Sequence, residues 1–237
     1  MSPAIAIAKR EVRTYFASPI PYIVATVFII LTGFFCFLTV LLEGQAEMRG
    51  YFGSLVPWML PILMPAISMR LLAEEKGSGS LELLITMPVR DWEVVVGKFL
   101  AAMFFVAVMV GLTGAFAISI ASIGPLDKSA AVGAYLGMFL QAGAYTAIGL
   151  MASSFTKNQI IAFIVGFAIC FFLFLFGKIS AFMPKAIQGT LQYLGADSHA
   201  EQMLRGVVDT RDVIYYLSIM AVCLVVATVS LDSRKWR

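Results

Sequence analysis

Six long apolar runs restrict the possible fold of this chain more than any other feature of its sequence. They occupy residues 21–42, 55–72, 92–123, 130–155, 159–180 and 212–231. An α-helix rises about 1.5 Å per residue, so about 20 apolar residues cross the hydrocarbon core of a bilayer. Only 13% of the residues are charged, which is too few to cover a soluble domain of this size. The sequence therefore predicts a single all-α polytopic membrane domain over residues 1–237, with six transmembrane helices.

The lysine and arginine residues predict how these spans are oriented. If the N-terminus is cytoplasmic, eleven of the 17 fall on the cytoplasmic side: Lys9, Arg10, Arg13, Arg70, Lys76, Arg90, Lys98, Lys157, Arg234, Lys235 and Arg237. Short cytoplasmic loops of membrane proteins are enriched in these two residue types. We therefore expect both termini, and the loop between the second and third spans, to lie in the cytoplasm.

Two amphipathic segments lie outside the spans. Residues 3–16 combine apolar side chains with a charged group, which is typical of a helix lying in the membrane interface: Lys9, Arg10, Glu11 and Arg13. A plain basic topology signal is the alternative for this segment. Residues 183–209 carry apolar side chains at helical spacing, so we expect one or two short amphipathic helices on the outer rim.

Three prolines in the second span predict an irregular helix. Pro57, Pro61 and Pro65 are spaced four residues apart and therefore share one face. Each proline removes a backbone donor and kinks or loosens the helix that contains it. The pattern indicates either a bendable gate helix or a static kink that improves packing.

The fourth span carries small and polar side chains within its apolar run. Gly133 and Gly137 allow close approach of another helix, either within the protomer or at a dimer seam. Gln141, Tyr145 and Thr146 lie near the middle of the span, where they either line a translocation path or form interhelical hydrogen bonds. No Asp, Glu, Lys, Arg or His side chain lies near the middle of a predicted span, which argues against proton or sodium coupling within this chain.

The sequence lacks the common motifs for catalysis and cofactor binding. A single histidine, His199, excludes an H-E-x-x-H metal site, and there is no G-x-S-x-G motif. Gly97 and Lys98 look like the end of a P-loop, but Phe99 follows the lysine and no G-x-x-x-x-G precedes it. No basic patch interleaved with aromatic residues indicates nucleic-acid binding. We therefore expect no catalytic residue, no metal site and no bound cofactor in this chain.

The loop between the second and third spans is rich in glycine and charge. Gly77 and Gly79 are expected to end the helix of the second span, and Ser80 is a suitable N-cap for a new helix. A short apolar helix over about residues 80–87 then ends before Pro88. From the residues alone, this helix either folds back on the protein or docks onto a cytoplasmic partner.

The same loop carries a family resemblance. Its sequence from Arg70 to Val89, RLLAEEKGSGSLELLITMPV, continues to Asp91-Trp92-Glu93 and Gly97-Lys98. It resembles the cytoplasmic loop of ABC-2-type permeases, in which an acidic pair and a basic residue precede Gly-Thr-x-Glu-x-Leu-Leu and a proline. Ser80 stands where threonine is usual and keeps the hydroxyl. Further matches at residues 153–159 and 205–212 are most similar to the small permeases of the gliding-motility-associated branch.

The resemblance implies a multi-pass permease subunit in a bacterial inner membrane. Such a subunit pairs with itself or a homologous permease, and two separate ATPase subunits that bind ATP and Mg drive it. Its loop helix would be a coupling helix that contacts the ATPase through Glu74, Glu75, Lys76, Ser80, Glu82, Leu83 and Leu84. The interfacial helix would provide a second contact through Lys9, Arg10, Glu11 and Arg13.

Export or translocation of a substrate is the function that the resemblance implies. The alternative within the same fold is a mechanotransmitter that drives an extracytoplasmic partner without substrate flux. A channel or carrier that works without an ATPase is a third interpretation, from another class of protein.

Overall fold

The computed structural model describes residues 3–43, 53, 56–80, 89–123 and 127–233. Over these residues all regular structure is helical, and six helices are long and apolar enough to cross a membrane. These spans are α2 (Pro19–Glu43), α4 (Val56–Ser68) continued by α5 (Arg70–Ser78), α7 (Asp91–Ile123), α8 (Lys128–Phe155), α9 (Gln159–Ile179) and α12 (Thr210–Asp232). The predicted all-α fold with six membrane spans is therefore confirmed.

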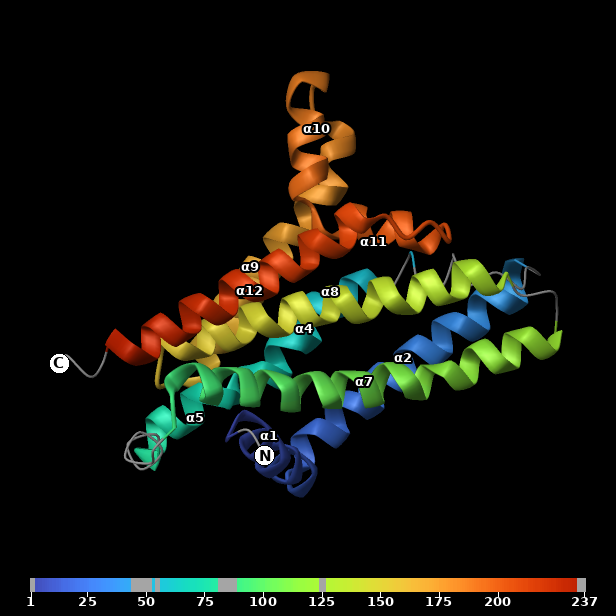
Figure 1. Ribbon diagram of the computed structural model, residues 1–237. Coiled ribbons are helices and arrows are strands. Elements are labelled where there is room, and N and C mark those ends of the chain that lie inside the picture. The colour runs from blue at the N-terminus through green and yellow to red at the C-terminus, as the bar shows by residue number, and fades with distance from the viewer. Residues whose placement is uncertain (1–2, 44–52, 54–55, 81–88, 124–126, 234–237) are drawn as a thin grey trace.

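Helix α8 forms the centre of the bundle (Figure 1) and contacts α4, α5, α7, α9, α11 and α12. In its apolar window 83% of the residues are buried, against 22% in each of α2, α9 and α12. Glycine and alanine recur along α8 and let neighbouring helices approach its backbone closely. Asp127 begins the helix by accepting hydrogen bonds from the backbone N–H groups of Ser129 and Ala130.

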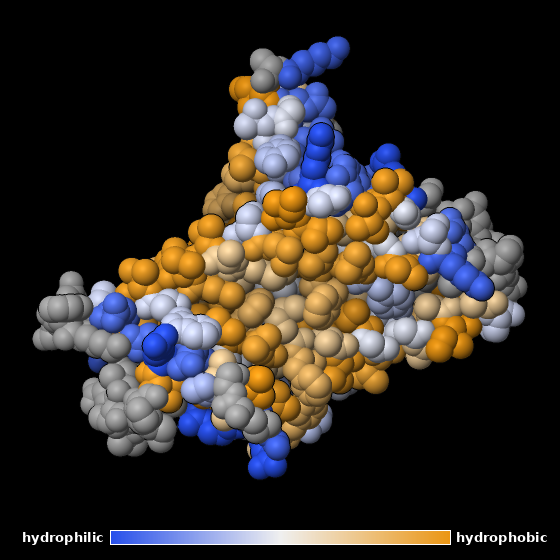
Figure 2. Space-filling model, viewed as in Figure 1, coloured by the Kyte–Doolittle hydropathy of each residue, from blue (hydrophilic) through white to orange (hydrophobic). Residues whose placement is uncertain are grey.

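The peripheral helices α2, α9 and α12 expose large apolar side chains along most of their length. On the face shown in Figure 2, apolar residues cover the middle of the bundle, and hydrophilic residues gather toward its ends and around the projecting α10. Such an apolar belt requires a hydrocarbon environment, because contiguous apolar patches this extensive are rare on soluble monomers.

The proline face of the second span is packed inside the bundle. Pro57 lies in the first turn of α4, where a missing N–H costs little, whereas Pro61 and Pro65 lie within the helix. All three are buried. Gly149 of α8 and Gly166 of α9 both approach Pro65, so three helices cross at this proline. The face predicted for a gate helix is thus an interhelical contact in this conformation.

Gly133 and Gly137 pack within the protomer. Both lie against Met203 of α11 (Ala196–Leu204). A Cβ added at Gly133 would overlap the carbonyl oxygen of Met203, so only glycine permits this approach. Of the two interpretations of the glycine pair, close packing inside one chain is the one that the structure bears out.

Two helical segments lie outside the spans, one at each half of the bundle. Helix α1 (Pro3–Ala17) is seen nearly end-on in Figure 1 and therefore runs across the spans, as expected for an interfacial helix. Between α9 and α12, the turn η1 (Ser180–Phe182) leads into α10 (Lys185–Leu194), which projects from the bundle, and then into α11, which is buried on α8. The predicted external segment is thus helical. Its second helix, α11, is inserted between spans, because Gly133 and Gly137 on the facing side of α8 are small.

Helices α1 and α5, the start of α7 and the end of α12 meet at one end of the bundle, which we call the terminal face. The 33 residues of α7 span about 50 Å, more than the roughly 30 Å of bilayer hydrocarbon. The helix therefore extends beyond the hydrocarbon at one end or at both. Helix α5 ends at Gly79, whose φ of 75° is the left-handed conformation that glycine adopts without strain. Of the two glycines predicted to end this helix, Gly79 does so, and Gly77 is still helical.

Candidate coupling site at the terminal face

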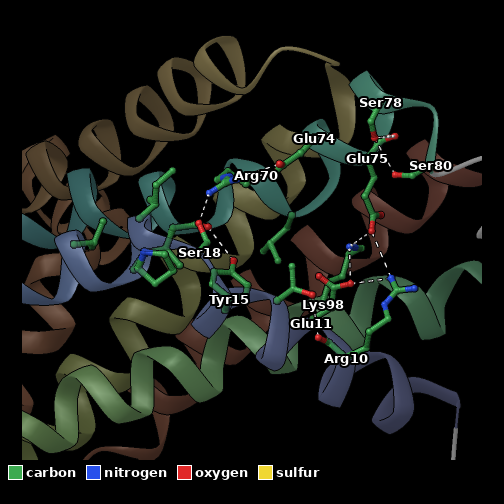
Figure 3. A pocket seen from close by; sticks show the side chains of 16 residues that line it. Arg10, Glu11, Tyr15, Ser18, Arg70, Glu74, Glu75, Ser78, Ser80 and Lys98 are labelled. Atoms are coloured by element: carbon green, nitrogen blue, oxygen red, sulfur yellow. Dashed lines mark hydrogen bonds and ion pairs between the residues drawn. The ribbon is translucent and has the colours of Figure 1, made fainter.

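Four charged side chains from three helices form an ion-pair network at the terminal face, in which the Lys98 and Glu11 residues are buried. Lys98 of α7 places its ammonium 2.8 Å from Glu75 Oε1 on α5 and 3.3 Å from Glu11 Oε1 on α1. Arg10 lies 2.9 Å from Glu11 Oε1 and 3.6 Å from Glu75 Oε1. Figure 3 shows these side chains converging on one another. We call Arg10, Glu11, Glu75 and Lys98 the Lys98 cluster.

Local packing explains why these groups meet. A Cβ at Gly97 would lie 2.8 Å from the carbonyl oxygen of Ala4, so the glycine lets α1 lie directly on α7. Ala4 and Glu11 form the buried side of α1. Lys98, which follows Gly97 in α7, lies beneath Glu11. The Gly97-Lys98 pair, which fails as a P-loop, is therefore the point at which the interfacial helix is held.

The Lys98 cluster is formally neutral, with two cations and two carboxylates. The Lys98 side chain is 1% exposed, and that of Glu11 is 10% exposed. Removing one partner of such a buried pair leaves an uncompensated charge, at a cost of about 3–5 kcal/mol. The cluster therefore couples α1, α5 and α7 so that none of the three shifts alone at low cost.

A second polar link joins the α4–α5 junction to α1 and α2. Arg70 and Glu74 form a bidentate ion pair, with N···O distances of 2.9 and 3.0 Å. Arg70 also donates a hydrogen bond to Ser18 Oγ at 3.0 Å. Tyr15 donates its hydroxyl to the carbonyl oxygen of Ile67 at 2.9 Å. Burial raises the pKa of the Tyr15 phenol, with a further contribution from the Glu11 carboxylate, so the phenol remains a hydrogen-bond donor.

The first turn of α5 is tied to the central helix. The hydroxyl of Ser153 on α8 accepts from the backbone N–H groups of Leu72 and Ala73 at 3.0 and 3.2 Å. The next carbonyl, that of Ser154, accepts from the Lys76 ammonium and from Ser230 Oγ of α12. Serines at the end of α8 thus connect α5 to both α8 and α12.

The residues predicted to contact an ATPase divide into two groups. Glu11, Glu75 and Lys76 are engaged inside this chain, and Lys76 is buried. The exposed group, of which Arg10 and Glu74 also form ion pairs within the chain, lies on α1 and around α5: Lys9, Arg10, Arg13, Glu74 and Ser80. Glu82, Leu83 and Leu84, the centre of the predicted coupling helix, lie outside the described residues.

Sequence reasoning did not assign a role to Lys98, Tyr15, Ser18 or Ser153. A signal existed for Lys98, because it is the one cation of α7 and lies two turns into the helix, within its apolar run. A cation placed there needs a partner from another element. Hydroxyl groups such as those of Ser18 and Ser153 give no comparable signal.

The residues predicted for a translocation path are buried. Gln141 Nε2 donates to Tyr145 Oη at 3.3 Å, one turn along the same helix. Thr146 donates to the carbonyl oxygen of Ala142 at 2.7 Å and also approaches the sulfur of Met64. The cavity that reaches Gln141 has a volume of about 10 Å³, roughly the space of one water molecule. In this conformation the three residues stabilise the core, and their role in a path stays a prediction.

A separate polar cluster lies where α11 meets α9 and α12. His199 Nδ1 is 2.6 Å from Asp212 Oδ1, and its Nε2 is 2.9 Å from the carbonyl oxygen of Tyr193. Asp197 pairs with Lys178 at 2.6 Å, and burial raises the pKa of its carboxyl despite the opposing effect of the lysine. Within the described part of the chain, no group of three His, Cys, Asp or Glu side chains is arranged to hold a metal ion.

Six apolar spans with α8 at their centre, and ion-paired helices at one face, define a multi-pass membrane protein. The chain belongs to a family of membrane transport components: residues 54–236 match the family model described as "ABC-2 family transporter protein". The matched region contains α5, α7 and α8 of the candidate site but begins after α1. A comparison with curated proteins found no match.

Proposed function

We propose that this chain is the permease subunit of an ABC transporter in a bacterial inner membrane, which couples ATP hydrolysis by separate ATPase subunits to export. The family match supports a permease. The observation that carries the coupling role is the Lys98 cluster, which links two helices at the terminal face to a membrane span. The resemblance of residues 153–159 and 205–212 supports the gliding-motility-associated branch.

In the proposed assembly the terminal face is cytoplasmic. Two ATPase subunits bind ATP and Mg, and the chain itself is not catalytic. Each ATPase presses on the segment that joins α5 to α7 and on the exposed residues of α1. Because Glu75 and Glu11 share Lys98, a displacement of either surface helix is passed to α7, and Ser153 and Ser154 pass it to α8. Two permeases, identical or homologous, form the membrane part.

Charge reversal in the predicted coupling helix tests the ATPase contact. Glu82→Lys combined with Leu83→Asp is expected to abolish co-purification of the ATPase, because it removes one charge contact and places a carboxylate in an apolar groove. The measurement is pull-down of the ATPase from detergent extracts, with Lys128→Glu as the control, since Lys128 begins α8 at the other end of the bundle. Undiminished binding and coupled ATPase activity in the double variant would refute the contact.

Flux measurements test export directly. Proteoliposomes containing this chain and its ATPase are expected to move a fluorescent phospholipid between leaflets only when ATP and Mg are supplied. The absence of Asp, Glu, Lys, Arg and His near the middle of the predicted spans favours such an amphipathic probe. Flux in liposomes that hold the permease alone would instead indicate a channel or carrier.

A mechanotransmitter is the second candidate function, and helix α10 favours it. This helix projects from the bundle (Figure 1) and exposes Ile187, Tyr193 and Leu194. An extracytoplasmic partner could engage such a helix and receive the motion. ATP-dependent displacement of a spin label at Tyr193, without lipid flux, would support this function over export.

A further inference from the structure

A cavity of about 450 Å³ lies between α1, the first turns of α2, the α4–α5 junction and α7. Its volume falls in the range of small-molecule sites, roughly 300–1,000 Å³. In Figure 3 the Lys98 cluster and the Arg70–Glu74 pair both border it. The proposed ATPase contact does not require a cavity at this position, so the cavity points to a second role for the terminal face.

The lining of this cavity is chemically divided. Its apolar wall comes from the start of α2 and the junction of α4 with α5: Ile20, Pro21, Val24, Ile67 and Leu71. Its polar wall comes from α1, α5 and α7. The apolar residues belong to two of the candidate membrane spans, α2 and α4–α5. Such a site matches the boundary between the acyl chains and the head group of a lipid.

The charged wall has no net charge. It contains three cations and three carboxylates: Arg10, Arg70, Lys98, Glu11, Glu74 and Glu75. Sites for anionic lipids are instead clusters of lysine and arginine with an excess of positive charge. A neutral wall with both signs close together is complementary to a zwitterion.

Two groups of opposite charge on this wall lie close enough together for one small zwitterion to contact both. Arg10 Nη2 is 3.6 Å from Glu75 Oε1. The other carboxylate oxygen of the same residue, Glu75 Oε2, is covered by the protein and has no hydrogen-bond partner among the described residues, so a ligand in the cavity reaches it only when the carboxylate turns. Buried carboxylate oxygens require a donor, and guanidinium groups bind phosphate well. A phosphate and an ammonium separated by two carbons would satisfy both groups at once.

We propose that this cavity binds an aminophospholipid of the leaflet at the terminal face, with phosphatidylethanolamine as the fitting class. The phosphate contacts Arg10, the Glu75 carboxylate turns toward the cavity so that Oε2 accepts from the primary ammonium, and the first methylenes of the acyl chains lie against Ile20, Pro21 and Val24. A quaternary choline carries no N–H and therefore leaves the buried oxygen without a donor. Binding requires neither an ATPase nor ATP, so the site stands or fails independently of the proposed transport function.

A head-group series on the unmodified protein tests this site. Native mass spectrometry of the full chain in detergent measures the binding of phosphatidylethanolamine, its monomethyl and dimethyl forms, phosphatidylcholine and phosphatidylglycerol. Affinity is expected to fall along the methylation series, by about tenfold or more from the first lipid to phosphatidylcholine, since one charge-assisted hydrogen bond is lost. Equal binding of these two lipids, or a preference for phosphatidylglycerol, would overturn the proposal.

Two further measurements distinguish a lipid held in this cavity from lipid attracted by surface charge and from a soluble ligand. Arg10→Gln is expected to weaken phosphatidylethanolamine binding about tenfold, whereas Arg13→Gln, on the same helix but outside the cavity lining, leaves it unchanged. Equal losses in the two variants would reduce the effect to general surface charge and contradict the site. Soluble glycerophosphoethanolamine should bind far more weakly than the lipid. Equal affinity would contradict the proposal that the ligand is a lipid and would assign the cavity to a soluble aminophosphate.

Discussion

Replacing Lys98 with methionine is expected to lower the free energy of unfolding by about 3–5 kcal/mol. Methionine keeps much of the side-chain volume but removes the cation that lies 2.8 Å from Glu75 and 3.3 Å from Glu11. Two carboxylates then share Arg10, whose side chain is 51% exposed and therefore compensates weakly. Denaturant unfolding in mixed micelles, followed by circular dichroism, measures the loss.

Two comparisons distinguish the cluster from a general effect of losing a lysine. Lys157→Met removes an exposed cation from the turn after α8, at the same end of the bundle, and should change stability by less than about 0.5 kcal/mol. Adding Glu11→Gln and Glu75→Gln to Lys98→Met removes the uncompensated anions and should recover most of the loss. If Lys98→Met were as stable as Lys157→Met, the cluster would not hold the three helices together.

The triple variant also tests whether the cluster is needed for coupling. If the Lys98 cluster transmits motion from the terminal face, the triple variant, in which Arg10 is the one charge of the cluster that remains, should fold and bind the ATPase while losing ATP-dependent flux. A triple variant with full flux would show that α1 and α5 need not be ion-paired to α7 for transport. Lys98→Met thus measures the contribution of the cluster to stability, and the triple variant measures its contribution to coupling.

Replacing Gly149 with valine is expected to destabilise the bundle by about 3 kcal/mol or more. A Cβ at this position would overlap Ser68 Oγ and lie 3.1 Å from Cα of Pro65. The Cα of Pro65 is a backbone atom of α4 and cannot move aside as a side chain could. Gly166 of α9 already approaches both Gly149 and Pro65. The valine must therefore separate α8 from α4, which also disturbs the proline face.

Gly111→Val is the matched control for this prediction. A Cβ at Gly111 meets no atom within 4 Å, and its helix, α7, carries the same β-branched penalty of a few tenths of a kcal/mol. Thermal aggregation measured by fluorescence-detected size exclusion should show a large fall in the midpoint for Gly149→Val and little change for Gly111→Val. Similar midpoints would mean that α4 and α8 accommodate the extra atoms by a small shift.

Much of this fold was predictable because its signals are local. A span follows from about 20 apolar residues, and a helix start follows from a capping side chain, as at Asp127, Asn158 and Asp209. The end of α5 at Gly79 follows from the conformational freedom of glycine. These features depend on a few neighbouring residues and on the solvent around them.

The partners of the charged residues were not predictable in the same way. Glu75 and Lys76 are adjacent in the sequence and were expected to share one role, yet Glu75 pairs with Lys98 while Lys76 turns toward Ser154 on α8. Neighbouring residues on a helix point about 100° apart. Which neighbour each one meets depends on the rotation of the helix and on how closely the next helix approaches.

By itself, the sequence determined that this chain spans a membrane six times as helices, because hydrocarbon accepts only segments whose backbone polar groups are satisfied internally. The tertiary structure alone decided that Gly97 seats α1 on α7 and that Lys98 joins Glu11 and Glu75. It also decided that Gly133 and Gly137 face α11 of the same chain. Those contacts arise from close packing between helices distant in the sequence, and the local pattern of apolar and polar residues does not encode the packing angles.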